Sequence, residues 1–392
     1  MSDDGWQIVS LSEIAENVSE RVNSVKDSGY DKWVGLKYID HGSVYVSRWG
    51  DISEAASSGK KFKSADVLLA RRFARSKSSE QERRAGVANF EGVCSGDAYV
   101  LREKPTIAKG LLKYILNTSR FWNYVMQNAD GSMSIRVKWQ ALAKYQLKIP
   151  SFEKQKAIVE LLDSVSEVIS SYQPIGAEIK YFRKALLFDI MDKIEKYSKV
   201  SDLGELKLGR MKSKKYTKGV NPKPYLRVGN IGVEYGLNLS RIEYMDFTEK
   251  ELDIYRLKSG DVLVTDGDLV SIWAAGRAAI FQGDIEDCCF QNHLIRLRTN
   301  STTLPEYAVL ALEYARYKGE IAKMVHMTTI ATLSVGRLAD VKIPMTDLSH
   351  QKSIADKFRK IDEIFENLEH TLNSYTNLQK VAIDSMLEFE DL

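Results

Sequence analysis

The sequence predicts an α+β protein with an internal repeat, in which an antiparallel pair of long, coiled-coil-like helices separates two strand-rich globular units. The helices give the first evidence of the repeat. Residues 151–169 (SFEKQKAIVELLDSVSEVI) are similar to residues 349–365 (SHQKSIADKFRKIDEIF), and a strand-like stretch ending in Ile-Pro precedes each. Gln155 and Gln351 of the two copies are 351 − 155 = 196 residues apart. This period indicates duplication of a whole domain with its helix, because solenoid repeats are much shorter.

The strands of the globular units repeat as well. Residues 62–71 (FKSADVLLAR) match residues 257–266 (LKSGDVLVTD), and each segment is typical of a turn followed by a buried strand. Two shorter matches follow: residues 88–92 (ANFEG) with 279–283 (AIFQG), and residues 98–102 (AYVLR) with 294–298 (LIRLR). We therefore expect common strands joined by surface loops of different length.

Each helix has an apolar stripe, or seam. In the first helix its steps alternate between three and four residues, a pattern typical of packing on a partner helix, and in the second the stripe is wider. In the first helix the seam consists of Ile158, Leu161, Val165, Val168, Tyr172, Ile175, Ile179, Phe182 and Leu186. In the second helix it consists of Ile354, Phe358, Ile361, Ile364, Phe365, Leu368, Leu372, Tyr375, Leu378, Ala382 and Met386. Ser151 and Ser349 are the expected N-caps, and Pro174 predicts a kink or a short break in the first helix.

These patterns divide the chain into four parts. Residues 1–150 form the first globular unit and residues 151–197 the first helical region, while residues 198–344 and 345–392 form the second unit and the second helical region. About 40 residues of helix, at about 1.5 Å each, span on the order of 60 Å. We expect the two helices to pack on each other and to hold the globular units a fixed distance apart.

The composition is typical of a globular protein: of 392 residues, 44% are hydrophobic and 28% charged, with a net charge of +3. No apolar run approaches the roughly 18 residues of a membrane span, and the polar start MSDDGWQ does not have the pattern of a signal peptide. We expect a cytoplasmic protein. Cys94, Cys288 and Cys289 have neither zinc-site spacing nor the even count of a disulfide framework, so we expect them in the core or in strands.

The motifs of common enzyme classes are missing from the sequence. The SSGKKF segment around Gly59 lacks the first glycine of a phosphate-binding loop and the hydroxyl residue after Lys60. No glycine-rich fingerprint follows a strand, and the five histidines, at positions 41, 293, 326, 350 and 370, do not have metal-ligand spacing. We therefore expect a protein that binds without catalysing, with no catalytic residue, no metal site and no cofactor in this chain.

Basic residues gather in both globular units. In the first unit they are Lys60, Lys61, Lys63, Arg71, Arg72, Arg75, Arg83 and Arg84, and in the second they are Lys212, Lys214, Lys215, Lys218, Lys223 and Arg227. Such clusters, interleaved with Ser, Gly and aromatic residues, suit contacts to phosphates, and an Arg in a groove can bind guanine through two hydrogen bonds. A solvated basic loop is the alternative. The occurrence of a cluster in both units favours nucleic-acid binding.

Several of these segments together resemble the specificity subunit of Type I restriction-modification systems. They are WQIVSLSEI at residues 6–14, KSADVLLARR followed by FEGVCSGDAYVLR in the first unit, PKPYLRVGNI at 222–231, and the helix starts PSFEKQKAI and PMTDLSHQKSI. The similarity extends over essentially the full chain. The second helix start has two more residues between proline and glutamine than the first.

The resemblance implies two target-recognition domains with mixed β-sheet cores, related by a pseudo-twofold repeat. Each would read one half of an asymmetric, interrupted site in double-stranded DNA, and the helices would set the spacer. The helices would also dock two modification subunits, and restriction subunits would join that core. S-adenosylmethionine, ATP and Mg²⁺ are expected on those partner subunits.

Two other functions compete with this one. A stand-alone methyltransferase or nuclease with attached recognition domains would need cofactor or metal motifs, which the sequence lacks. A coiled-coil scaffold whose basic loops bind another protein would show no sequence-dependent protection of DNA.

Overall fold

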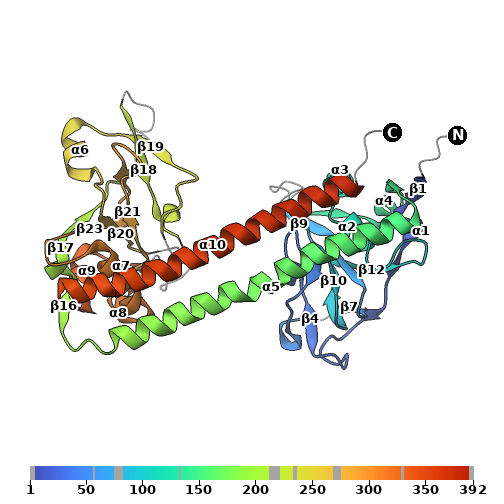
Figure 1. The fold of residues 1–392 in the computed structure, drawn as a ribbon, viewed down its shortest axis with the longest axis horizontal. Coiled ribbons are helices and arrows are strands. Elements are labelled where there is room, and N and C mark those ends of the chain that lie inside the picture. The colour runs from blue at the N-terminus through green and yellow to red at the C-terminus, as the bar shows by residue number, and fades with distance from the viewer. Residues whose placement is uncertain are drawn as a thin grey trace. The chain divides into compact units, whose positions relative to one another are not determined.

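The computed structural model describes residues 5–55, 58–74, 83–131, 134–211, 221–232, 236–267, 275–327 and 331–387 (Figure 1). The chain forms two compact units, and each unit includes parts of both long helices. Unit 1 comprises Met1–Ile175 and Leu368–Leu392, and unit 2 comprises Gly176–Asn367.

Unit 1 is built on two five-stranded mixed sheets. The first has the order β2-β12-β8-β10-β5 and the second β3-β7-β11-β4-β6, and each contains one parallel pair, β10 with β5 and β11 with β4. The strands of the first sheet are β2 (Ala15–Val18), β12 (Ala98–Glu103), β8 (Val67–Ala70), β10 (Ala85–Ala88) and β5 (Tyr45–Val46). Those of the second are β3 (Arg21–Val22), β7 (Gly59–Phe62), β11 (Gly92–Ser95), β4 (Lys32–Val34) and β6 (Gly50–Asp51).

Smaller elements complete unit 1. A three-stranded sheet contains β13 (Ala129–Asp130), β14 (Ser134–Val137) and β9 (Arg72–Ala74), and β1 (Gln7–Ser10) pairs with β15 (Gln146–Ile149). The short helices are α1 (Leu11–Ile14), α2 (Leu112–Ile115), α3 (Ser119–Gln127) and α4 (Trp139–Leu142).

Unit 2 repeats this plan with fewer strands in the part that the structure describes. An antiparallel sheet has the order β17-β23-β20-β21, and a smaller mixed sheet has the order β19-β18-β22. Their strands are β17 (Gly204–Leu208), β23 (Leu294–Thr299), β20 (Asp261–Thr265), β21 (Ala278–Phe281), β19 (Glu243–Asp246), β18 (Pro222–Leu226) and β22 (Cys289–Phe290). The other elements are β16 (Tyr197–Lys199), β24 (His326–Met327), β25 (Ala331–Thr332), β26 (Lys342–Pro344), α6 (Glu249–Tyr255), α7 (Pro305–Tyr317), α8 (Glu320–Met324) and α9 (Val335–Ala339).

Strand pairing tests the expected repeat directly. Val67 of β8 pairs with Leu101, and Val262 of β20 pairs with Leu297, which confirms the match of residues 98–102 with 294–298. The match of residues 88–92 with 279–283 is wrong by two residues. Val67 pairs with Val87 whereas Val262 pairs with Ile280. The sequences ANFEG and AIFQG are similar, but they do not occupy equivalent positions in the two sheets. The register of a strand is set by pairing with its neighbour and not by local similarity.

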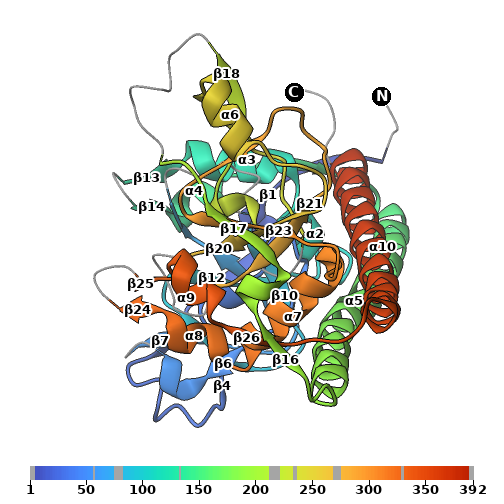
Figure 2. The same cartoon turned by 90° about the vertical axis from the view of Figure 1, so that its left-hand side faces the viewer.

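Two 40-residue helices run through both units, α5 (Phe152–Met191) and α10 (Leu348–Leu387). Helix α5 is continuous through Pro174, so the expected break is absent. In unit 1, Gln379 of α10 donates a hydrogen bond to Ser166 of α5 at 2.6 Å, and in unit 2 Arg183 of α5 donates to Asp362 of α10, also at 2.6 Å. A second contact in each unit gives the direction: Tyr172 lies beside Tyr375 in unit 1, and Lys180 lies over the ring of Phe365 in unit 2. As the residue number rises in α5 it falls in α10, so the segments are antiparallel within each unit, as expected. Figure 2 shows the two helices side by side.

The helical segments complete the core of each unit. In unit 1, Leu162 and Ile383 join a cluster with Trp122 of α3. In unit 2, Leu187 and Phe358 join a cluster with strands β20 and β23 and helix α7. A fully buried leucine such as Leu162 or Leu187 contributes about 1.5–3 kcal/mol through removal of its side chain from water.

The seam of the first helix is wrong in phase. Ile354 and Phe358 of α10 are buried as expected, but Leu161 and Phe182 of α5 are 50% and 57% exposed. The other seam residues of the docking prediction, which are Ile158, Val165, Val168, Ile179, Ile361, Phe365, Leu368 and Tyr375, are half-buried. The buried face of α5 consists of Gln155, Val159, Leu162, Ser166, Ile169, Arg183, Leu187 and Met191. Three of these residues are polar and bind neighbouring elements, so hydrophobic periodicity alone gave the wrong face.

The helix caps differ between the two copies. Helix α5 begins one residue after Ser151, as expected, whereas α10 begins at Leu348 and contains Ser349. At that end Asp347 accepts a hydrogen bond from the backbone N–H of His350 at 3.0 Å. The two additional residues thus replace a serine cap with an aspartate cap.

Two further expectations concern the cysteines and membrane segments. Cys94, Cys288 and Cys289 are buried and free, and burial raises the pKa of each thiol to about 12. Among the described residues, no helix is both long enough and apolar enough to cross a membrane.

Candidate nucleic-acid interface

A buried ion pair fixes the same turn in both units. Arg102 donates to both carboxylate oxygens of Asp66 at 2.8 Å, and Arg298 does the same to Asp261 at 2.7 and 2.6 Å. Both aspartates are 1% exposed, and each also accepts the backbone N–H three residues earlier. This two-point geometry explains why the KSADV and KSGDV segments are so similar, since it fixes the start of β8 and of β20.

The glutamines of the two helix starts have the same role. Gln155 accepts from the backbone N–H of Ala108 at 2.9 Å, and Gln351 accepts from that of Leu304 at 2.9 Å. Each side-chain amide also donates to a carbonyl just before its helix, of Pro150 and of Thr346 respectively, at 2.8 Å. The Gln-Lys motif therefore joins each helix start to a loop of its globular unit.

Two basic residues of the first cluster face the interior. Lys60 is 8% exposed and donates to the carbonyl of Ala98 at 2.7 Å, and its burial lowers the pKa of the ammonium. Arg83 is 5% exposed and binds the carbonyl of Asn117 and the hydroxyl of Ser119. These two residues are corrections to the predicted DNA-binding set, because their donors are directed into unit 1 and cannot reach a phosphate outside.

The other described residues of the first cluster are more accessible. Lys63 is exposed, and Lys61 is half-buried with its ammonium 5.8 Å from the ring centre of Tyr30. Arg84 is half-buried and donates to the carbonyl of Leu36 at 3.1 Å. Arg71 and Arg72 lie where strand β8 ends and β9 begins.

Three arginines converge on one carboxylate at that strand end. Arg72 and Arg136 approach Asp97 at 3.2 and 3.1 Å, and Arg71 lies 3.7 Å away. Burial opposes the charge on Asp97, but hydrogen bonds from Arg136 and Arg72 outweigh it and lower the pKa of this carboxyl. One carboxylate cannot use all the donors of three guanidinium groups, and the side chains of Arg72 and Arg136 are 48% and 47% exposed. The cluster therefore presents donors to an anion or a base edge.

The basic cluster of unit 2 is largely paired or outside the described residues. Lys223 binds Asp287 at 2.6 Å, a hydrogen bond that raises the pKa of the ammonium, and Arg227 lies 3.1 Å from Glu243. The predictions that lie outside the described residues are Arg75, Lys212, Lys214, Lys215 and Lys218.

Arg71 and Arg72 belong to the predicted set, but Asp97, Arg136, Asp266 and His293 do not, although the repeat contains a signal for Asp266. The matched ten-residue segments of the two copies end in Arg71 and Asp266, a reversal of charge at one position of the repeat. Opposite them in the structure are Asp97 and His293. Arg136 gave no such signal, because it lies on β14, far along the chain.

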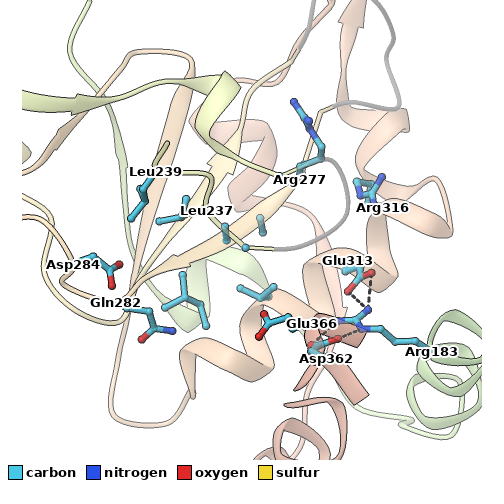
Figure 3. A pocket seen from close by; sticks show the side chains of 17 residues that line it. Arg183, Leu237, Leu239, Arg277, Gln282, Asp284, Glu313, Arg316, Asp362 and Glu366 are labelled. Carbon is cyan, nitrogen blue, oxygen red and sulfur yellow. Dashed lines mark hydrogen bonds and ion pairs between the residues drawn. The ribbon is translucent and has the colours of Figure 1, made fainter. Parts of the chain in front are cut away.

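Unit 2 also contains a cavity of about 430 Å³ beside Arg183 (Figure 3). Arg183 donates to both oxygens of Glu313, at 2.9 and 2.8 Å, and to Asp362, and all three line the cavity. The rest of the lining includes both Arg277 and Glu366, so charges of both signs meet there. Neither in this cavity nor anywhere else in the described part of the chain do three His, Cys, Asp or Glu side chains gather as a metal site requires.

The family model of the Type I restriction modification DNA specificity domain matches the chain twice, at residues 3–181 and 192–375. The chain belongs to this family. The two matched segments follow the internal repeat, so the resemblance and the fold class that we inferred from the sequence are both confirmed.

Two relatives of the chain are distant in sequence. The chain is 24% identical over 307 residues to the Type I restriction enzyme EcoKI specificity subunit of Escherichia coli K12. It is 27% identical over 168 residues to the putative type I restriction enzyme MjaX specificity subunit of Methanocaldococcus jannaschii. These matches cover 72% and 42% of this chain, but only 65% and 38% of the two relatives, less than two thirds of their length.

Solved structures share the fold of this family member. One is the S subunit of a Type I restriction-modification system from M. genitalium. The match covers 100% of this chain and 98% of the M. genitalium chain, with a TM-score of 0.55 and 13% identity. Another is a chain from a study of complex assembly and conformational transition of the type I R-M system. The match covers 97% of each of the two chains, with a TM-score of 0.55 and 17% identity. At these identities the likeness concerns the fold.

Proposed function

We propose that the chain is the DNA sequence-specificity subunit of a Type I restriction-modification complex. The observation that carries this proposal is the double match to a DNA specificity domain over a chain whose two units repeat the same frame. The frame residues Asp66 and Asp261, with their arginines, keep the same geometry. The strand-end residues, by contrast, differ in charge between the copies. Two recognition domains that share strands and buried ion pairs but differ in their strand-end residues suit an asymmetric bipartite site in double-stranded DNA.

We keep the four-part division as part of this proposal. Residues 1–150 and 198–344 would be the two target-recognition domains, and residues 151–197 and 345–392 would be the helical spacer. The spacer length would then fix the distance between the two half-sites. Under this proposal, unit 1 contacts DNA through Lys61, Lys63, Arg71, Arg72 and Arg84.

The outer faces of the helices support docking of two modification subunits. Large apolar side chains lie exposed on them in both units. In unit 1 these are Phe152, Leu161, Ile175, Leu378 and Val381, and in unit 2 they are Tyr181, Phe182, Leu348 and Ile364, with exposed fractions from 41% to 78%. Apolar patches that water does not favour are typical of protein interfaces. Leu161 and Phe182 do not pack inside the chain as seam residues. Their exposure fits the expectation that the helices dock modification subunits.

The chemistry of the complex would belong to its other subunits. S-adenosylmethionine for adenine methylation, and ATP and Mg²⁺ for restriction, would bind the modification and restriction subunits, while this chain contributes recognition without catalysis. We place the complex in the cytoplasm, where it meets DNA.

The direct test is co-expression of the chain with its modification subunit, followed by genome-wide mapping of methylated adenine. The proposal expects one bipartite motif with an unspecific spacer of fixed length. Methylation by the purified chain alone would favour a stand-alone methyltransferase. No sequence-dependent methylation from the assembled complex would favour a scaffold.

A further inference from the structure

One position of the repeat has the same backbone environment in both units. The N–H of Arg71 donates to the carbonyl of Asp97 at 3.0 Å, and the N–H of Asp266 donates to that of His293 at 3.2 Å. We call the residues around this position the strand-end site, because it follows the last residue of β8 in unit 1 and of β20 in unit 2.

A second backbone contact repeats at the same place. The carbonyl of Arg71 accepts from the N–H of Val137 at 3.0 Å, and that of Asp266 accepts from Leu333 at 2.6 Å. Val137 and Leu333 are 333 − 137 = 196 residues apart, the same separation as the two glutamines of the helix starts. The main chain therefore holds both strand-end sites in one geometry, and only their side chains differ.

The side chains differ in sign. In unit 1 the site contains Arg71, Arg72 and Arg136 around the single acid Asp97. In unit 2 the position of Arg71 is taken by Asp266, whose carboxylate lies 3.1 Å from Nδ1 of His293. Guanidinium donors of unit 1 are thus replaced by a carboxylate acceptor.

The corresponding flanking positions in unit 2 carry no arginine. Arg72 corresponds to Gly267 by the separation of Arg71 and Asp266, 266 − 71 = 195 residues, and Arg136 corresponds to Thr332 by the 196-residue separation of Val137 and Leu333. Neither residue adds a positive charge to Asp266. The difference between the units thus extends over the whole strand-end site.

Both sites are accessible at their outer edge. The side chains of Arg72 and Arg136 are 48% and 47% exposed, and that of His293 is 45% exposed. The carboxylate of Asp266 is 11% exposed, so a partner would reach it along His293. The ion pair at the start of the same strand, Asp66 with Arg102 and Asp261 with Arg298, is kept in both units. The reversal of charge at the other end of this strand, where the side chains reach the surface, therefore fits a difference in ligand better than a difference in stability.

We propose that the strand-end site is where each unit reads a base of its half-site, with unit 1 donating to guanine and unit 2 accepting from a base amino group. This inference rests on the proposed function. Arginine matches the two acceptors of guanine, and a carboxylate accepts from the amino group of cytosine. A phosphate cannot be the ligand of Asp266, because like charges repel. The unit 2 site therefore contacts a base edge, where the carboxylate accepts a hydrogen bond from an amino group.

The test uses the complete complex of the full chain with its modification subunits, and compares methylated motifs in cells. The unit 2 variants are Asp266→Asn and His293→Ala, and the unit 1 variants are Arg72→Ala and Arg136→Ala. We expect each variant to reduce the preference at one base position of one half-motif by about tenfold or more. Variants of unit 1 and of unit 2 must affect different halves.

Matched controls are Lys26→Ala in unit 1 and Asp253→Asn in unit 2, both exposed charged residues away from the strand-end site. They should leave every base preference unchanged. His293→Ala guards against misfolding, because truncation of a half-exposed side chain leaves the core intact. Retention of the second half-motif shows that a variant complex has folded and assembled.

The possible outcomes separate this inference from the function on which it rests. If the wild-type complex gives no bipartite motif, the proposed function fails. If the wild type gives one and the strand-end variants keep all its preferences, or weaken both halves equally, the inference alone is overturned.

Discussion

Arg183 of unit 2 and Gln379 of unit 1 occupy the same position of the repeat, 379 − 183 = 196 residues apart, but one is an ion and the other is neutral. Arg183 binds Glu313 and Asp362 in the interior of unit 2. Gln379 is 5% exposed and binds Ser166, which corresponds to Asp362 in the repeat. The same helix contact is therefore an ion network in one unit and a neutral hydrogen bond in the other.

Replacing Arg183 with Gln should destabilise unit 2 strongly. The change leaves two acids near the core without their guanidinium partner, and breaking a buried pair in this way costs about 3–5 kcal/mol. Glu313 corresponds to Asn117 of unit 1, 313 − 117 = 196 residues apart. The triple variant Arg183→Gln, Glu313→Asn and Asp362→Ser, which has the residues of unit 1 at these three positions, should regain most of this loss. Urea unfolding of the full chain measures both effects.

The control for this variant is Arg359→Ala, which removes an exposed ion pair on α10. Arg359 is 59% exposed and lies 2.6 Å from Glu363, so its loss should cost at most about 1 kcal/mol. Equal destabilisation by Arg183→Gln and Arg359→Ala would contradict the ion network that we describe.

Loss of a helix-start glutamine should destabilise its own unit. Gln351 is 0% exposed, and Gln351→Ala leaves the N–H of Leu304 and the carbonyls of Thr302 and Thr346 without this partner. Each unsatisfied buried group costs about 1–3 kcal/mol. The exposed neighbour Lys352→Ala is the matched control and should change the free energy of unfolding by no more than about 0.5 kcal/mol.

Asp97 and Asp266 should have opposite effects on the pH dependence of stability. The pKa of Asp97 is lowered in the folded state, so its stabilisation is complete above the unfolded pKa of 3.8 and is lost as the pH falls through the folded pKa. The pKa of Asp266 is raised from 3.8 by burial, despite the opposing effect of His293. Charged Asp266 therefore disfavours folding above its folded pKa, and this penalty disappears as the pH falls towards 3.8.

Asparagine variants test these signs. Asp97→Asn should lower the melting temperature at pH 7, with a difference from wild type that shrinks in acid. Asp266→Asn should raise or maintain the melting temperature at pH 7, and its difference from wild type should also shrink in acid. If Asp266→Asn and Asp97→Asn lowered the melting temperature at pH 7 by the same amount, the opposite pKa shifts of the two aspartates would be refuted.

Charges on the outer helix faces should prevent assembly without unfolding the chain. Leu161→Glu and Phe182→Glu change side chains that are 50% and 57% exposed, so the melting temperature should stay within a few degrees. Co-purification with the modification subunit should fall at least tenfold, since buried apolar anchors dominate most interfaces. Glu167→Gln, on an exposed position of α5, is the control. Normal assembly of both glutamate variants would exclude this face as the docking surface.

The sequence predicted the repeated frame well because the frame consists of local signals. The turn before Asp66 and Asp261, the strands that follow and the glutamine helix starts each occupy a few consecutive residues in both copies. The periodicity of α10 predicted its buried face only in part. Ile354 and Phe358 are buried, but Ile364 and Leu378 of the predicted seam are 58% and 55% exposed.

The missed features depend on contacts distant in sequence. Gln155, Ser166 and Arg183 of α5 are polar but buried, because other elements supply their hydrogen-bond partners. The buried face of α5 is therefore not its most apolar face. Lys60 belongs to the basic cluster predicted to bind DNA, but its ammonium donates a hydrogen bond to the carbonyl of Ala98 inside unit 1. Neither effect can be recognised from spacing along a single helix or strand.

The central claim, that the chain contains two independent readers on one frame, is tested most directly by an exchange of recognition segments. Residues 60–84 would be replaced by the corresponding segment of another member of the family, and methylated adenines would then be mapped genome-wide in cells with the modification subunit. The account predicts a changed half-motif on one side, with the other half and the spacer length unchanged. A change in both halves, or a single continuous motif, would contradict it.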